Sequence, residues 1–239
     1  MEGHSHMKGA KHIGIVACSY EGAALCYQTI CNEGSHRMGR HCHPEVSLHN
    51  HPLSEYMRCI EENKWEGVAQ LMLSSADRLA KAGADFLICP DNTIHQAYSL
   101  VRKKSPLPWL HIAEEVARLA SERSYKRVGV LGTKYLMEGL VYQEAFGERN
   151  IDFVLPSGEQ RKKINTIIFD ELVYGIIEHN SKRCFLSVIQ ELKSEGCDAV
   201  VLGCTEIPLI VLPEESPLPV LDSTRILARA ALEYALRWV

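Results

Sequence analysis

The chain has 239 residues, of which 46% are hydrophobic and 23% are charged, and this balance excludes a fibrous or an intrinsically disordered protein. Its 26 basic and 30 acidic residues give a net charge of −4 and form no basic stripe, so we expect no nucleic-acid partner. No apolar run approaches the ~20 residues that a membrane helix needs, so we expect no membrane span.

Cysteine usage and the first residues point to the cytoplasm. The nine cysteines are odd in number and form no C-x-x-C pair, and several lie inside apolar runs (Cys18, Cys26, Cys89, Cys197). Reduced thiols, most of them small core residues, are the simplest interpretation. Residues 1–7 (MEGHSHM) resemble a short histidine-bearing expression leader and lack the charged-then-apolar pattern of a signal peptide.

Short apolar runs alternate with amphipathic helical patterns along the chain. The runs expected to be buried strands of a parallel sheet are residues 13–17, 86–89, 128–131 and 199–202. A helical pattern precedes the second run and is expected to end at Gly83, and a similar pattern before the fourth run is expected to end at Gly196. This alternation predicts βαβ units and an α/β fold.

The sequence also repeats itself. KHIGIV at Lys11 returns as KRVGVL at Lys126, residues 83–94 return as 196–207, and SPLPWL at Ser105 returns as SPLPVL at Ser216. These blocks keep their order at a spacing of 111 to 115 residues, which indicates an internal duplication. We expect two similar lobes that pack together directly, because no linker-like segment separates them. The predicted boundaries are about residues 8–104 plus 216–239 for a discontinuous first lobe and about 105–215 for the second.

Asp91 and Cys204 occupy equivalent positions in the repeat, just after two predicted strands. Ligand sites in open parallel sheets lie beyond the carboxyl ends of the strands, so the two side chains should face each other across a cleft between the lobes. One could remove a proton from a tetrahedral carbon while the other delivers a proton to the opposite face. Asn92, Thr93 and Thr205 follow them and could bind a carboxylate. The alternative is structural, with Asp91 as a helix cap and Cys204 as a small buried residue.

Two further groups of residues are candidate pocket neighbours. Ser19 and Tyr20 follow the first strand of the first half, and Thr133 and Tyr135 follow its counterpart, with turn formation as an equal alternative. Histidines are dense between the first helix and the second strand (His36, His41, His43, His49, His51). Their spacing is not that of a structural zinc site, so we favour a polar pocket wall at His51 over a metal site or a surface loop.

Sequence motifs exclude other chemistries. The phosphate-binding patterns G-x-x-x-x-G-K-[ST] and G-x-G-x-x-G are absent, and so is the G-x-S-x-G nucleophile elbow. These absences argue against nucleotide-dependent and serine-hydrolase activity.

Four segments resemble those of the aspartate/glutamate racemases. Residues 89–95 (CPDNTIH) resemble the family's C-N-T-x-H motif and residues 202–208 (LGCTEIP) its L-G-C-T-E-I motif, and 167–175 and 221–224 also look like family segments. The resemblance runs from about Lys11 through nearly the whole chain. It implies a cofactor-independent enzyme with two flavodoxin-like lobes related by a pseudo-twofold axis, an active site between them, and a homodimeric assembly. It also makes Glu171 a possible organiser of the cleft.

The chain departs from the family pattern at its first acid/base position. Asp91 stands where the family usually has a cysteine, and Cys89 lies two positions earlier. The loop 17–23 (ACSYEGA) likewise replaces the usual G-G-x-G-P-E. Ordinary pKa values of about 3.9 for Asp and 8.5 for Cys are far apart, so reversible proton transfer needs an environment that draws them together.

We therefore expect an amino-acid racemase that acts on a small carboxylate-bearing substrate, aspartate or glutamate first, with no metal and no pyridoxal phosphate. The expected acid/base pair is Asp91 and Cys204. The alternatives are a decarboxylase or cis–trans isomerase of a related small diacid, and a two-lobed binding protein without catalytic activity.

Overall fold

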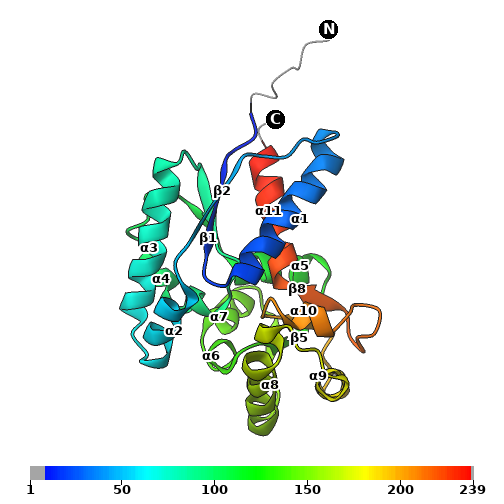
Figure 1. Cartoon of the computed structure of the whole chain (residues 1–239). Coiled ribbons are helices and arrows are strands. Elements are labelled where there is room, and N and C mark those ends of the chain that lie inside the picture. Colours follow the sequence, from blue (N-terminus) through cyan, green and yellow to red (C-terminus); the bar gives the residue numbers. More distant parts are fainter. Residues whose placement is uncertain (1–8, 238–239) are drawn as a thin grey trace.

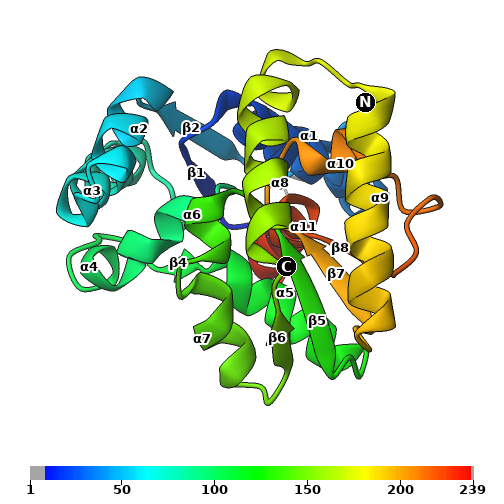
Figure 2. The same ribbon diagram turned by 90° about the horizontal axis from the view of Figure 1, so that it is seen from below.

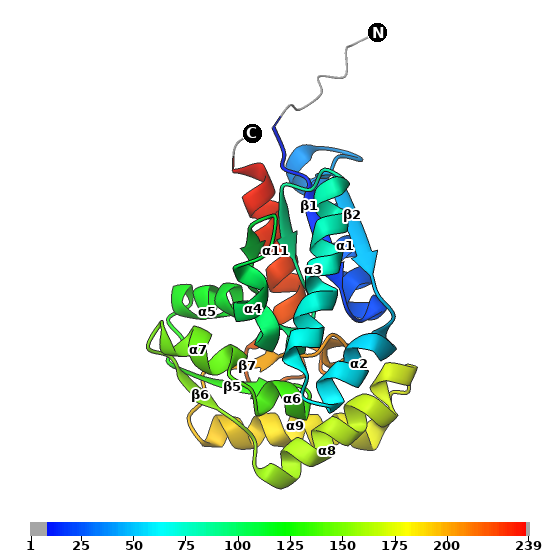
Figure 3. The same ribbon diagram turned by 90° about the vertical axis from the view of Figure 1, so that its left-hand side faces the viewer.

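The computed structural model describes residues 9–237, so the leader-like residues 1–7 lie outside the described part of the chain. It contains two parallel four-stranded sheets, with elements of the first in the upper half of Figures 1 and 3 and elements of the second in the lower half. The first has the order β2-β1-β3-β4 and comprises β1 (Ile13–Ala17), β2 (Val46–Asn50), β3 (Phe86–Ile88) and β4 (Trp109–Leu110). The second has the order β6-β5-β7-β8 and comprises β5 (Arg127–Leu131), β6 (Asp152–Val154), β7 (Ala199–Leu202) and β8 (Val220–Asp222). The second order repeats the first, which confirms the predicted α/β fold with two flavodoxin-like halves.

Helices cover both faces of each sheet. On the first sheet, one face carries α1 (Tyr20–Met38) and α11 (Ser223–Leu236), which lie side by side in Figure 1. Its other face carries α2 (Leu53–Glu61), α3 (Trp65–Lys81), the 3₁₀ turn η1 (Thr93–Ala97) and α4 (Tyr98–Arg102).

On the second sheet, one face carries α5 (Ile112–Glu122) and α7 (Val141–Gly147). The other carries α6 (Lys134–Met137), α8 (Gly158–Asp170), η2 (Leu172–Tyr174), α9 (His179–Ser194) and α10 (Ile207–Ile210). Figure 2 shows α8 and α9 on one side of β5 and β7, with α5 and α7 on the other. None of the helices in residues 9–237 is long and apolar enough to span a membrane.

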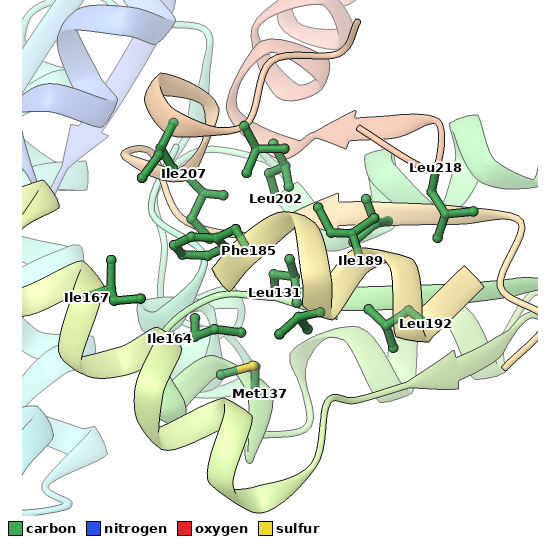
Figure 4. Close-up of a cluster of buried hydrophobic side chains, with 14 of the residues drawn as sticks. Leu131, Met137, Ile164, Ile167, Phe185, Ile189, Leu192, Leu202, Ile207 and Leu218 are labelled. Carbon is green, nitrogen blue, oxygen red and sulfur yellow. The ribbon is translucent and has the colours of Figure 1, made fainter. Parts of the chain in front are cut away.

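Strand residues alternate between the two layers because successive side chains point to opposite faces. Val128 and Val130 face α5 and α7, whereas Leu131 faces α8 and α9. Figure 4 shows this last layer, where side chains from two strands and two long helices converge: Leu131, Leu202, Ile164, Ile167, Phe185, Ile189 and Leu192. Burial of this apolar surface stabilises the second sheet at ~25 cal/mol per Å².

The predicted helix ends are confirmed. The chain leaves α3 at Gly83 with φ of +92° and leaves α9 at Gly196 with φ of +88°. L-residues rarely adopt this backbone conformation, whereas glycine adopts it at no steric cost. The two turns start β3 and β7 at equivalent points, so the repeat extends to the turns that precede the two strands whose far ends carry Asp91 and Cys204.

Strand pairing indicates where the chain crosses from one half to the other. β4 pairs with β3 although it lies beyond residue 105, and β8 pairs with β7 although it lies beyond residue 216. The packing of α5 against α11 joins the halves directly. We propose crossing points after β4 and after β8, a few residues later than the repeat predicts.

Candidate active site

Asp91 lies three residues after the end of β3, where the loop after β3 meets the loop after β1. Its Oδ2 accepts hydrogen bonds from the backbone N–H groups of Cys18 at 3.2 Å and Ser19 at 3.1 Å, which follow β1. Burial raises the pKa of Asp91 to about 7, and the hydrogen bonds from Ser19 only partly oppose this rise. A carboxyl group with such a pKa populates both its protonated and its ionised form at neutral pH.

Cys204 lies two residues after the end of β7. Its thiol donates a hydrogen bond to the carboxylate of buried Glu206, with Sγ and Oε2 2.8 Å apart. Burial and the negative charge of Glu206 raise the pKa of the thiol well above its usual value. Cys204 is therefore a protonated group at neutral pH, and it is held in one orientation by its acceptor.

Asp91 and Cys204 line the same pocket, which opens to solvent. It lies between the ends of β3 and β7, where the two sheets meet. The predicted pair is therefore brought to one cavity, together with five of the predicted substrate-binding residues: Ser19, Asn92, Thr93, Thr133 and Thr205. Tyr135 also lines it.

Hydroxyl groups from both halves surround the pair. The Oγ1 atoms of Thr93 and Thr133 lie 3.1 Å apart, which joins the loop after β3 to the loop after β5. Thr133 also caps α6, and Ser19 caps α1 by accepting from the N–H of Gly22. Ser19 and Thr133 therefore both cap a helix and line the pocket.

The side chain of Asn92 is held by protein groups. Its Oδ1 accepts from the hydroxyl of Tyr142 at 2.7 Å, and its Nδ2 donates to Oγ of Ser223 at 3.0 Å. Ser223 in turn donates to the carbonyl oxygen of Leu202 at 2.9 Å. This chain of hydrogen bonds fixes the residue next to Asp91 relative to the end of β7, and the binding of a substrate by Asn92 remains a prediction.

His51 lies outside this pocket. Its ring lines a neighbouring hollow with Tyr20 and Asn50, and its Nε2 is 3.2 Å from Oγ of Ser74 on α3. His49 bonds Ser75 instead. Of the other predicted histidines, His36, His41 and His43 are exposed. Within residues 9–237, no group of three or more His, Cys, Asp or Glu side chains is placed to hold a metal ion.

Comparison with known proteins gives the same family as the motifs. The model of the Asp/Glu/Hydantoin racemase family matches residues 14–231. The chain belongs to this family.

Relatives extend the match over most of the chain. The broad specificity amino-acid racemase RacX of Bacillus subtilis is 24% identical over 82% of this chain and 84% of its own length. A crystal structure from Yersinia pestis, provisionally described as an Asp/Glu racemase, is 30% identical with a TM-score of 0.88 and covers 95% of this chain and 100% of that one. The aspartate racemase homologue PH1733 from Pyrococcus horikoshii is 28% identical with a TM-score of 0.82 and covers 94% and 99%. The family and the isomerase class predicted from the motifs are confirmed.

Cys89 does not substitute for the missing first cysteine of the racemase pattern. It is fully buried in the core against α2 and α3 and does not line the pocket. Glu171 also lies outside the pocket, where its carboxylate accepts from the hydroxyl of Ser181. Asp91 is therefore the acidic group that the loop after β3 presents to the pocket that Cys204 also lines.

Two features of this pocket were not predicted from the sequence. Glu206 stands in the recognised motif, two residues after Cys204, and this proximity was the available signal. The other feature is an apolar wall made by α2 and by the end of α8 with η2: Leu53, Met57, Ile60, Ile168, Phe169 and Val173. Its residues have the helical spacing of ordinary core positions, so no sequence signal separates them from the core.

Proposed function

We propose that this protein racemises a small α-amino acid without metal or pyridoxal phosphate, with Asp91 and Cys204 acting on opposite faces of the α-carbon. The observation that carries the proposal is that both side chains line one pocket from the ends of corresponding strands, β3 and β7. A reaction that inverts a tetrahedral carbon needs one proton acceptor and one proton donor in this arrangement.

The environments of the two groups suit different starting roles. Asp91, with a pKa of about 7, is an available base, whereas the raised pKa of Cys204 keeps its thiol protonated as the donor. The first transfer converts the carboxylate to an acid and the thiol to a thiolate, which is the state that reacts with the other enantiomer. Hydroxyls of Thr93, Thr133 and Thr205 surround the pocket and would stabilise the negative charge that develops on the substrate carboxylate.

Membership of the racemase family supports an amino-acid substrate, and the family resemblance points to aspartate or glutamate. RacX, the B. subtilis relative, is described as having broad specificity. The resemblance also leads us to propose a cytoplasmic protein that forms a homodimer. Light scattering after size exclusion would test the homodimer. A monomer with full activity would remove this part of the proposal.

The test is α-proton exchange in heavy water, followed by NMR together with chiral chromatography. Product enantiomer should carry deuterium at the α-carbon while unreacted substrate initially keeps protium. Asp91→Asn and Cys204→Ser should each lower inversion ~10²–10⁴-fold, because each removes one positioned acid or base. Exchange without inversion can survive in each variant, but for opposite enantiomers.

Matched controls are Asp77→Asn and Cys42→Ser, which change the same side chains at exposed positions. Equal exchange of both enantiomers in both site variants would show that neither residue is specific for one face. Carbon dioxide release from a substituted malonate, or isomerisation of an unsaturated diacid, would favour the alternative enzymes. Binding of amino acids without any exchange would favour a binding protein.

A further inference from the structure

The pocket has one apolar wall, and helices of both halves contribute to it. Leu53, Met57 and Ile60 come from α2 on the first sheet, and Ile168, Phe169 and Val173 come from α8 and η2 on the second. Figure 3 shows α2 above one end of α8, where the two halves meet. Each methylene group of a ligand that is buried against such a wall improves binding about fourfold.

The charged side chains that line the pocket are both acidic. They are Asp91 and Glu206, and the described lining contains no Lys or Arg. Two histidines lie close by but outside the lining. Nδ1 of buried His95 is 2.8 Å from the backbone carbonyl oxygen of Asp91, and burial lowers the pKa of His95 to about 4, so it supplies no positive charge at neutral pH. His51 lies in the neighbouring hollow and bonds Ser74. The other polar side chains of the lining carry hydroxyls, an amide and the thiols of Cys18 and Cys204.

This distribution matches the two ends of an α-amino acid but not a second carboxylate. The α-ammonium group complements the negative charge of Asp91 and Glu206, and the α-carboxylate can take hydrogen bonds from the threonine hydroxyls. A side-chain carboxylate would add a negative charge beside two carboxylates and would lose water against an apolar wall, with no cation to compensate. A lysine side chain would place its ammonium group against the same wall.

We propose that the pocket selects amino acids with an apolar side chain, aliphatic or aromatic, rather than aspartate or glutamate. This inference rests on the proposed racemase function and narrows its substrate class. The apolar wall binds the side chain, and the acid/base pair acts on the α-carbon next to it.

The first test is a substrate panel for the full chain in heavy water: L-leucine, L-phenylalanine, L-aspartate, L-glutamate and L-lysine. We expect kcat/KM for α-proton exchange of leucine or phenylalanine to exceed that of aspartate by about 10²-fold or more. Aspartate, glutamate or lysine as the best substrate would overturn the inference and leave the racemase function intact. If no amino acid exchanges, the racemase function fails, and calorimetry with leucine and aspartate then decides the side-chain preference of the pocket separately.

The second test places a cation in the apolar wall. Val173→Arg should raise the ratio of aspartate to leucine exchange at least tenfold, because it supplies the missing counter-ion and removes apolar contact. Tyr174→Arg is the matched control, since this neighbour is 74% exposed and does not line the pocket, and its ratio should stay that of the wild type. Met57→Arg repeats the test from α2 if Val173→Arg does not fold. An unchanged ratio of aspartate to leucine exchange in a folded Val173→Arg or Met57→Arg variant would contradict the proposal that this wall binds the substrate side chain.

Discussion

Sγ of Cys204 lies 2.8 Å from Oε2 of Glu206, and the thiol donates a hydrogen bond to this buried carboxylate. The hydrogen bond and the negative charge both favour the protonated thiol. Asp91 has its pKa raised to about 7, so the two groups that line the pocket differ in proton affinity and in chemistry. The pair is thus asymmetric, unlike the two cysteines that the racemase motif leads one to expect.

Replacing Glu206 should make the thiol of Cys204 easier to ionise. Glu206→Gln keeps a hydrogen-bond acceptor near the thiol but removes the negative charge, so the pKa of Cys204 should fall. The measurement is the pH dependence of alkylation by iodoacetamide, followed at Cys204 by peptide mass spectrometry. We expect the midpoint to move to lower pH in Glu206→Gln and to stay in place in Glu171→Gln, whose carboxylate lies outside the pocket. A midpoint that does not move, or that rises, would contradict the role of Glu206.

Racemisation should depend on the ionisation of Asp91. The ionised form is the base, so kcat/KM should fall about tenfold per pH unit below pH 7. Because the equilibrium constant of racemisation is 1, the kcat/KM values of the two enantiomers are equal at every pH, and both should give this same acid limb. Initial rates from pH 5 to 9 in both directions check this. An acid limb centred near pH 4 would mean that Asp91 keeps an ordinary pKa or is not the base.

The position of Asp91 and Cys204 in one pocket was predictable from the sequence because two independent regularities agree there. The repeat makes Asp91 and Cys204 equivalent, and parallel sheets place ligands at the carboxyl ends of their strands. His51 was misplaced because β2 ends at Asn50 and the following turn carries its ring toward Ser74. Spacing along a strand predicts which side chains share a face, but it does not predict which of two adjoining hollows a side chain beyond the strand will enter.

The apolar wall marks a different limit. Met57 and Phe169 lie in amphipathic helices, and the side chain that meets a pocket has the same periodicity as one that meets the core. Only the approach of α2 to α8, elements more than 90 residues apart in the chain, creates the pocket between them. For this reason, the proposed preference for an apolar side chain could not be predicted from the sequence.

The raised pKa of Asp91 should also appear in the stability of the protein. Folding raises this pKa from its ordinary value to about 7, so the carboxyl group favours the folded state at low pH and loses this contribution as pH rises from about 4 to 7. Asp91→Asn lacks this titration. The free energy of unfolding of Asp91→Asn minus that of the wild type should therefore increase by on the order of 1–3 kcal/mol between pH 4.5 and pH 8. Denaturant titrations at both pH values measure it, with Asp77→Asn as the control, and a constant or decreasing difference would contradict the burial of an ionised Asp91.

The hydroxyl of Tyr142 should matter for both stability and activity. It is buried, and it donates to Asn92, which is tied through Ser223 to the carbonyl of Leu202 at the end of β7. Tyr142→Phe leaves Oδ1 of Asn92 buried without this donor, which should lower the free energy of unfolding by about 1–3 kcal/mol.

Asn92 adjoins Asp91, so loosening it should also misplace the base. We expect kcat of Tyr142→Phe to fall more than KM rises, because the reacting carboxylate shifts while the apolar wall that binds the side chain is unchanged. Tyr125→Phe is the control, since this half-buried tyrosine lies at the edge of the second sheet's core and does not line the pocket, and it should change stability by less than about 0.5 kcal/mol. Chemical denaturation and initial rates on the same preparations measure both effects. A loss of stability with kcat unchanged would show that the hydrogen bonds of Tyr142 and Asn92 stabilise the fold but do not position Asp91.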